Sequence, residues 1–296
     1  MQASLTLSSL NAASEAEFVA ALAGVFEHAP WVAQAAAGRR PFADVQSLHE
    51  AMLAAVRALA EAGLLRFLCA HPELAGAQAR AGRMTVDSTR EQGGLALAAL
   101  PDEENARWDR LNRQYRERFG FPFILCARRH GYASMLRAFE RRLGNDRAAE
   151  LEAALGEIAR ISRLRLAARV AGHALPRIAG RLTTHVLDIS RGRPAEGLRV
   201  ELLDASGAAP RTLADARTDA SGSTATALLD GEPLRIGRYE MRFHVGDYFR
   251  RTGTQAQDEE PFLDVVPIAF GVSEPEGDYH VPITITPWAY STYRGE

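Results

Sequence analysis

The sequence predicts a two-domain protein in which an all-α helical bundle precedes an all-β sandwich. Apolar residues recur at helical spacing from about residue 14 to 168. That pattern stops at Gly172 and Pro176, and afterwards the period is two, as in Tyr239, Met241 and Phe243. The 296 residues also exceed one typical domain. We therefore expect a helical domain over residues 1–170, a linker over 171–177 and a β-sandwich over 178–296.

The helical elements follow from stripes of apolar residues and from their end signals. Ser14 with Glu17 reads as a capping box that begins the first clear helix. Further helices are expected around 48–59, 132–143 and 147–166, with breaks at Gly and Pro signals such as 120–122. Two stripes are most regular: Phe18, Leu22, Val25 and Phe26, and then Trp108, Leu111, Tyr115 and Phe119.

The second half reads as short strands separated by turns. Turn signals at residues 191–194, 205–207 and 229–233 divide segments with period-two alternation. The chain then ends in an aromatic and basic tail, residues 290–296 (YSTYRGE). Because chain ends usually fray, aromatic residues this close to the terminus indicate that a folded element holds the tail.

Composition excludes several classes of function. The formal net charge is only -2, which argues against a nucleic-acid partner, and no apolar run is long enough to span a membrane. The sequence contains no lysine, which excludes Schiff-base and P-loop chemistry. Cys69 and Cys126 lie in apolar stretches, as reduced buried thiols do. We expect a cytoplasmic protein whose partners are small molecules and copies of itself.

His71 is the first candidate functional residue in the helical half. It precedes Pro72 at the end of an apolar run, and proline restricts the preceding residue to extended geometry. His71 therefore leaves the helix, either into a cleft or as an ordinary surface-loop histidine.

Two further candidates have competing structural interpretations. Ser88 and Glu91 have the spacing of a capping box, with Ser88 as the cap. Arg165 continues an apolar stripe at helical spacing and so points inward, where a guanidinium needs an anion. That anion is either an internal carboxylate or a ligand.

Taken in order, five motifs resemble 2-oxo-4-hydroxy-4-carboxy-5-ureidoimidazoline (OHCU) decarboxylases across residues 7–168. They are VFEHAPWVA at 25–33, HPEL at 71–74, STREQ at 88–92, FGFPFI at 119–124 and ISRLRL at 161–166. The resemblance implies that His71 is the catalytic acid/base. It implies that Glu91 and Gln92 bind the ureido and ring groups and that Arg165 holds a substrate oxygen.

The implied decarboxylation needs neither a cofactor nor a metal, because the substrate's conjugated ring can accept the electrons left by carbon dioxide. The protein has to orient the substrate and move a proton. The resemblance implies (S)-allantoin as the product. Besides the residues above, we expect Pro72 and Ser88 to bind the substrate and Phe119, Phe121 and Ile124 to form a wall that excludes water.

The second half resembles the transthyretin-related 5-hydroxyisourate hydrolases over about residues 178–296, and so implies a transthyretin-like sandwich. The motifs are LTTHVLD at 182–188, FHVGDYF at 243–249, YHVP at 279–282 and the terminal tail. In that family two histidines cooperate with an arginine and the tail. They fall on His185 and His280, with Arg294 and Tyr293 in the tail. The implied chemistry is general-base activation of water with stabilisation of the oxyanion.

The chain departs from this family at three positions. The family arginine follows a turn glycine, but residues 218–223 read TDASGS, so that Ser223 replaces it. Asp278 stands where a first histidine is usual, and Glu296 replaces the terminal serine. Losing one oxyanion donor costs about 3 kcal/mol of transition-state stabilisation. Three other arginines are candidate substitutes: Arg181, Arg217 and Arg235.

The leading interpretation is a fused enzyme that converts 5-hydroxyisourate through OHCU to (S)-allantoin. One alternative keeps the decarboxylase and makes the C-terminal domain an oligomerisation scaffold, which Ser223, Asp278 and Glu296 favour. Another makes that domain a small-molecule carrier like transthyretin, against which His185 and His280 argue. The resemblance also implies a homodimer or homotetramer through the C-terminal domain.

Overall fold

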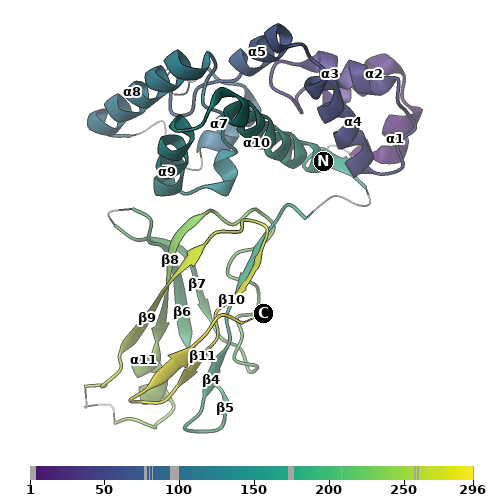
Figure 1. Ribbon diagram of the computed structural model, residues 1–296. Coiled ribbons are helices and arrows are strands. Elements are labelled where there is room, and N and C mark those ends of the chain that lie inside the picture. Colours follow the sequence, from purple (N-terminus) through teal and green to yellow (C-terminus); the bar gives the residue numbers. More distant parts are fainter. Residues whose placement is uncertain are drawn as a thin grey trace. The chain divides into compact units, whose positions relative to one another are not determined.

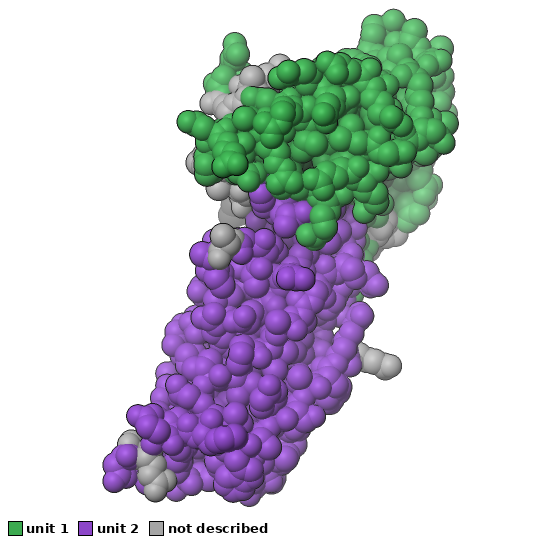
Figure 2. Space-filling view, turned by 60° about the vertical axis from the view of Figure 1, so that its left-hand side comes forward, with its two compact units in different colours: residues 1–128, 135–178 green, residues 129–134, 179–296 purple. Residues whose placement is uncertain are grey.

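The computed structural model describes residues 5–76, 79, 81, 83–93, 100–172, 177–207, 209–256, 258 and 260–295, without the side chains of 92 and 93. The chain divides into two compact units, which Figure 2 colours separately. Unit 1 comprises Met1–Arg128 and Met135–Ile178, and unit 2 comprises Arg129–Ser134 and Ala179–Glu296. Four residues of the expected linker, 173–176, and Glu296 lie outside the described residues.

Unit 1 is helical, as the sequence predicts. Its helices are α1 (Leu7–Ala12), α2 (Glu15–Leu22), α3 (Pro30–Ala37), α4 (Val45–Arg57), α5 (Glu61–Cys69), α7 (Val86–Gly93), α8 (Asp102–Phe119), α9 (Tyr132–Leu143) and α10 (Arg147–Ala167) (Figure 1). A 3-10 turn, η2 (Ala127–Arg129), precedes α9, and β1 (Leu5–Thr6) pairs in parallel with β2 (Val170–Ala171). Helices 48–59, 132–143 and 147–166 were therefore predicted within a few residues.

The ends of these helices show which capping signals were read correctly. The predicted box at α2 is confirmed, since Ser14 and Glu17 cap each other's backbone. The predicted box at Ser88 is wrong. The helix α7 begins at Val86, and the Thr85 hydroxyl accepts the Ser88 N–H at 3.3 Å. Ser88 therefore lies inside the helix, where its side chain is free for a different partner.

An aromatic cluster forms part of the core of unit 1. The ring of Tyr115 on α8 lies 4.7 to 5.8 Å, between centroids, from the rings of Phe119, Phe121, Phe123 and Phe139. All five side chains are buried. The predicted stripe on α8 thus faces the core, apart from Leu111, which is half-buried. This cluster supports the non-helical segment between α8 and η2.

Unit 2 is a β-sandwich, which confirms the predicted fold class. One four-stranded sheet has the order β12-β11-β4-β5 and the other has the order β7-β6-β8-β9, while β3 pairs in parallel with β10. The strands are β3 (Arg181–Thr183), β4 (Val186–Asp188), β5 (Arg193–Pro194), β6 (Arg199–Asp204), β7 (Arg211–Arg217), β8 (Gly237–His244), β9 (Val265–Val272), β10 (Asp278–His280), β11 (Ile283–Ile285) and β12 (Tyr290–Thr292). A short helix, α11 (Val245–Arg251), follows β8.

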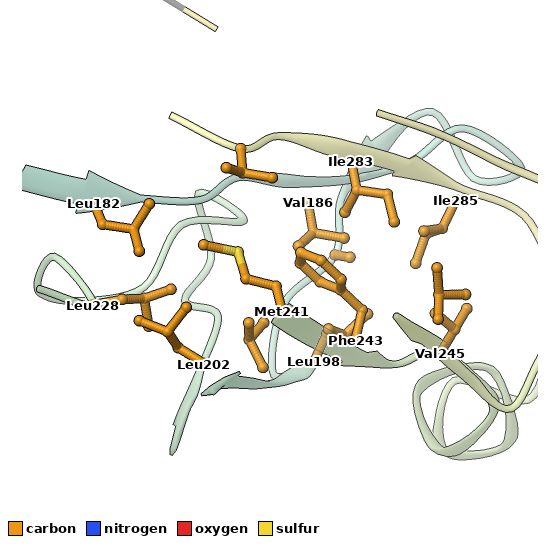
Figure 3. Close-up of a cluster of buried hydrophobic side chains, with 14 of the residues drawn as sticks. Leu182, Val186, Leu198, Leu202, Leu228, Met241, Phe243, Val245, Ile283 and Ile285 are labelled. Atoms are coloured by element: carbon orange, nitrogen blue, oxygen red, sulfur yellow. The ribbon is translucent and has the colours of Figure 1, made fainter. Parts of the chain in front are cut away.

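Side chains from both four-stranded sheets fill the core of this sandwich. Val186, Ile283 and Ile285 come from one sheet, and Met241 and Phe243 come from the other (Figure 3). All of them are at most 1% exposed. The period-two alternation along β8 thus sets the inward face, and the alternate residues of the strand point outward.

The C-terminal tail is ordered, as predicted, but backbone hydrogen bonds hold it and not its aromatic side chains. Strand β12 pairs with β11, and the Gly295 N–H donates to the His280 carbonyl oxygen at 2.9 Å. The aromatic side chains remain open, since Trp288 is 67% and Tyr293 65% exposed. Main-chain pairing therefore orders the tail without burial of its aromatic rings.

Across the part of the chain that is described, no helix combines the length and apolar character that a membrane span requires.

Candidate functional site

A cavity of about 40 Å³ lies in unit 1. This volume is well below the roughly 300 to 1,000 Å³ of typical small-molecule sites, so the cavity is small in this structure. The cavity draws residues from α7, α10 and two connecting segments, which are far apart in the sequence. Its walls are formed by His71, Pro72, Leu74, Ser88, Glu91, Phe123, Ile124, Leu125, Ala127, Ile161 and Arg165.

His71 reaches the cavity because α5 ends two residues earlier, at Cys69. Its N–H still donates to the Leu68 carbonyl at 3.1 Å, and Pro72 then directs the chain away from the helix. The side chain is 9% exposed and packs edge-on against Phe67. The sequence left a cleft and a surface loop as alternatives, and the structure has the cleft.

The environment of His71 keeps its imidazole neutral. Burial lowers its pKa to about 4, against smaller opposing effects from Glu27 and backbone carbonyls. Its Nδ1 lies 3.2 Å from the Phe67 carbonyl oxygen, which can only accept a hydrogen bond. Nδ1 therefore carries the proton, and Nε2 presents a lone pair. At neutral pH this is the form of a general base.

Arg165 on α10 is buried among carboxylates. Its Nε and Nη2 each donate to Glu91 at 2.8 Å, and its Nη1 donates to Glu27 at 2.6 Å. Burial opposes the charge, but the hydrogen bonds and charges of Glu91 and Glu27 outweigh it and raise the pKa of Arg165. The inward orientation was predicted correctly. The anions are internal carboxylates, and the guanidinium also lines the cavity.

Sequence reasoning did not select Glu27 as a site residue. It is 3% exposed and accepts hydrogen bonds from Thr85 (2.7 Å) and Ser88 (3.0 Å) in addition to Arg165. Burial disfavours its charge, but Thr85, Arg165 and Ser88 together lower its pKa. The available signal was a lone acidic residue inside an apolar motif, directly after Phe26.

These groups form a network with an excess of negative charge. Two carboxylates, Glu27 and Glu91, surround one guanidinium, Arg165, while His71 is neutral. Of the two carboxylates only Glu91 lines the cavity, so the cavity offers one carboxylate acceptor for N–H groups and one neutral base. Such an arrangement suits a ligand rich in amide-like donors.

The expected hydrophobic wall is only partly where the sequence placed it. Ile124 and Pro72 line the cavity, but Phe119 and Phe121 do not belong to its lining and pack around Tyr115. Phe123 takes their place. Three consecutive residues, Phe123, Ile124 and Leu125, line the cavity, so this segment has no period that separates core from cavity residues. Gln92 is in α7, and its side chain lies outside the described residues.

In unit 2 the two candidate histidines come from neighbouring segments. His185 follows β3, and its Nε2 lies 2.9 Å from the Ser221 carbonyl oxygen. His280 ends β10, where its Nδ1 lies 2.9 Å from the Thr183 hydroxyl. Burial and the nearby His185 lower the pKa of His280. The structure therefore brings the two predicted histidines together.

The turn and the tail both approach these histidines closely. Gly222, with φ of 80°, packs so tightly that a Cβ would lie 3.2 Å from Nε2 of His185. At Gly295 a Cβ would lie 2.6 Å from Cδ2 of His280. Ser223 forms a β-bridge with His185. The residue that replaces the family arginine is therefore adjacent to the histidine pair.

The remaining predicted groups of unit 2 make contacts elsewhere. The Arg294 guanidinium lies 5.0 Å above the Tyr279 ring and is exposed, as is Tyr293. Among the substitute arginines, Arg181 approaches Asp230 at 3.8 Å and Arg217 donates to the Gly197 carbonyl at 2.9 Å. Burial, together with the nearby Arg211, lowers the pKa of Arg235. None of these contacts joins an arginine to His185 or His280.

Within the described ranges, no group of three or more His, Cys, Asp or Glu side chains is arranged to hold a metal ion.

Comparisons with known proteins match the two units separately. The family model "OHCU decarboxylase" matches residues 11–167, and that of the "HIUase/Transthyretin family" matches residues 182–295. The 2-oxo-4-hydroxy-4-carboxy-5-ureidoimidazoline decarboxylase of Mus musculus is 38% identical over 165 residues, which are 56% of this chain and 93% of that protein. The 5-hydroxyisourate hydrolase of Deinococcus radiodurans is 48% identical over 114 residues, 38% of this chain and 94% of that protein.

One solved structure matches along the whole chain. It is a crystal structure of (S)-allantoin synthase, 32% identical, with a TM-score of 0.51. The match covers 99% of this chain and 100% of that protein. The chain therefore belongs to the OHCU decarboxylase family in its helical unit and to the HIUase/transthyretin family in its β-sandwich, as a fusion of the two.

Proposed function

We propose that the chain is a bifunctional enzyme that converts 5-hydroxyisourate through OHCU to (S)-allantoin. The sandwich at residues 178–296 performs the hydrolysis, and the helical domain at residues 1–170 performs the decarboxylation without a cofactor. Support comes from relatives of both units, which are a 5-hydroxyisourate hydrolase and an OHCU decarboxylase, and from the similarity to (S)-allantoin synthase. The single observation that carries the proposal is the neutral His71 facing Glu91 and Arg165 in one cavity.

His71 is the proton carrier in the proposed decarboxylation. Its Nε2 takes the proton of the substrate hydroxyl, and the carbon–carbon bond to the carboxyl group breaks to release carbon dioxide. The electron pair of that bond passes into the ring and comes to rest on the ring nitrogen of the C=N bond, which takes a proton from solvent. The proton held by His71 adds to the neighbouring ring carbon as the hydroxyl becomes a carbonyl. The carboxylate and one solvent proton are thus consumed for each carbon dioxide released. Because the lone pair of Nε2 faces the cavity, His71 can take the proton from the hydroxyl and later give it to the ring carbon.

Glu91 and Arg165 hold the substrate for this transfer. The Glu91 carboxylate accepts N–H groups of the ureido substituent, a role shared with Gln92, the next residue in the sequence. Arg165 fixes Glu91 through two hydrogen bonds of 2.8 Å. The Arg165 guanidinium also lines the cavity and can donate to a substrate oxygen. Ser88, Pro72 and Ile124 complete the binding surface. Orientation of this kind lowers the entropic part of the barrier.

The test follows both intermediates in one experiment. Urate oxidase generates 5-hydroxyisourate, the chain is added, absorbance follows the two intermediates, and circular dichroism reports the handedness of allantoin. We expect both intermediates to disappear faster than they do spontaneously. His71→Ala abolishes decarboxylation and leaves hydrolysis intact. Loss of both activities in a folded His71→Ala protein contradicts the two-site proposal.

For the hydrolase we propose His280 and His185 as the water-activating groups, with Arg294 and Tyr293 of the tail beside them. Ser223 favours a second candidate, a decarboxylase whose sandwich serves as a scaffold or a binder of another small molecule. Ser223→Arg distinguishes the two. A gain of about 100-fold in hydrolysis indicates an impaired enzyme. Decay of 5-hydroxyisourate at its uncatalysed rate in both proteins indicates the scaffold.

We also propose that the chain assembles as a homodimer or homotetramer through the sandwich, in the cytoplasm. The exposed Trp288 and Tyr290 near the edge strand β12 support assembly, since aromatic residues are enriched at interfaces. Cys69 and Cys126 form no disulfide, which suits a reducing compartment. Sedimentation of the full chain and of a Trp288→Glu variant measures the oligomeric state. A monomeric wild-type chain contradicts this part of the proposal.

A further inference from the structure

One wall of the cavity is formed by a segment that is neither helix nor strand. Phe123, Ile124 and Leu125 all line the cavity, and they lie between α8 and η2. A segment without regular secondary structure obtains its shape from the partners of its backbone groups. The side chains that bond this segment therefore decide where the wall stands.

Arg142 on α9 makes two contacts with this wall from behind. Its Nη1 donates to the Ile124 carbonyl at 2.8 Å, and its guanidinium carbon lies 4.6 Å from the centre of the Phe123 ring. Arg142 is 5% exposed and does not belong to the lining of the cavity. It thus holds one backbone group and one aromatic ring of two adjacent wall residues.

A buried carboxylate fixes Arg142 in this position. Glu150 on α10 is fully buried, and its Oε1 accepts from Arg142 Nε at 2.9 Å and Nη2 at 2.6 Å. The Tyr115 hydroxyl donates to the same oxygen, and Asn145 Nδ2 donates to Oε2 at 2.7 Å. Only a planar guanidinium can use two nitrogens for Glu150, a third for Ile124 and its face for Phe123.

The wall has a second anchor on the same side. The Cys126 N–H donates to Glu157 Oε2 at 2.9 Å. Phe123 also stacks on Phe139, with ring centroids 3.9 Å apart. These contacts fix the far end of the segment and the ring, but neither reaches the Ile124 carbonyl. The position of Ile124 in the cavity therefore depends on Arg142.

We propose that Arg142 is a positioning residue of the decarboxylase, which sets the distance between the Phe123–Ile124 wall and the carboxylate side of the cavity. This inference rests on the proposed function of that cavity. The wall holds the flat, conjugated ring of the substrate against His71 and Glu91. Displacement of the wall therefore lets the substrate move, although no group that reacts is changed. The predicted consequence is a loss of turnover in a folded protein.

Arg142→Lys tests the proposal, because lysine keeps the charge next to Glu150 but has neither the fork nor the flat face. Arg40→Lys is the matched control. Arg40 lies in the same unit, stacks 4.8 Å over the Phe18 ring and donates to the carbonyls of Ala37, Leu10 and Ala13, away from the cavity. We expect kcat/KM for OHCU to fall about 100-fold in Arg142→Lys. We expect it to stay within about twofold in Arg40→Lys.

Hydrogen exchange of residues 121–127 supplies a readout that does not depend on activity. In Arg142→Lys these amides exchange at least about tenfold faster, while those of α4 keep the wild-type rate. If Arg142→Lys does not fold, Arg142→Met with Glu150→Gln removes both charges together, and the same changes are expected.

The outcomes separate this proposal from the proposed function. Wild-type kcat/KM and unchanged exchange in a folded Arg142 variant overturn the positioning role. An equal loss in Arg40→Lys also overturns it, because the effect is then one of general stability. If the wild-type chain does not consume OHCU, the proposed function fails. The exchange measurement still decides in that case whether Arg142 holds the wall.

Discussion

Arg165→Met tests the charge balance of the cavity through stability alone. In the native chain the side chains of Arg165, Glu27 and Glu91 are 4%, 2% and 12% exposed. Removing the guanidinium leaves Glu27 buried without a counter-charge, which typically costs about 3 to 5 kcal/mol. Since Thr85 and Ser88 still donate to Glu27, we expect a loss of about 3 kcal/mol. For a unit of this size that loss lowers Tm by about 6 to 12 °C.

The effect of pH follows from the pKa of Glu27. In the native protein this pKa is lowered, so that its contribution to stability is present above the unfolded pKa and is lost as the pH falls through the folded value. Without Arg165 the burial of Glu27 remains but the compensating charge does not, and its pKa rises. The penalty of Arg165→Met is therefore largest at neutral pH and shrinks near pH 4, where Glu27 takes up a proton.

The assay is thermal unfolding followed by helical circular dichroism at pH 7.5 and pH 4.5. Arg57→Met is the control, because the Arg57–Glu152 pair is 52% and 64% exposed and such pairs contribute at most about 1 kcal/mol. Adding Glu27→Gln to Arg165→Met removes the uncompensated charge and recovers part of the loss. A Tm of Arg165→Met equal to that of the wild type at pH 7.5, or a larger penalty at pH 4.5, refutes the reasoning.

Three further predictions concern the other histidines and the tail. The folded pKa values of His49 and His71 are both about 4, below the unfolded value of about 6.5. The free energy of unfolding of unit 1 therefore falls by about 3 kcal/mol per histidine as the pH falls from 6.5 to 4. Urea unfolding at stepped pH measures this, and a free energy that does not change over this range contradicts it. Gly295→Ala places a Cβ against His280 and reduces hydrolysis at least about tenfold without changing decarboxylation, as the two-step absorbance assay reports. Thr183→Val removes the Nδ1 partner of His280 and shifts the pH profile of hydrolysis, whereas Thr183→Ser retains it; identical profiles for all three proteins argue against a role for Thr183.

The sequence was most informative where one local rule acts alone. Apolar periodicity predicted the helical unit and the sandwich, and the Ser14 capping box set the start of α2. The same rule failed at Ser88, because Thr85, three residues earlier, precedes the helix and its hydroxyl accepts the Ser88 N–H. Ser88 has the box spacing but lies inside the helix. The hydroxyls of Thr85 and Ser88 both donate to Glu27, a tertiary partner that local spacing does not reveal.

The position of the cavity wall could not be predicted for a related reason. Phe119, Phe121 and Phe123 have the same chemistry, and a segment without regular structure has no period that assigns each ring to the core or to the cavity. The assignment comes from Arg142 and Phe139, which hold Phe123. Local spacing carries no information about these partners on a different helix.

The hydrogen bonds of the site join residues that are far apart in the sequence. They could not be predicted from local patterns, and they also stabilise the helical unit. Glu27 and Arg165 lie 138 residues apart, and Glu91 and Arg165 lie 74 apart, yet each pair is joined by hydrogen bonds at the cavity. These bonds also tie α7 and the segment after α2 to α10. The cavity therefore cannot form before the helices that carry it are assembled, and loss of one charge weakens the assembly. Variants of Glu27 and Arg165 thus change stability and turnover together. Among the described residues the His71 side chain hydrogen-bonds to the Phe67 carbonyl of the preceding helix, so we expect its replacement to reduce turnover alone.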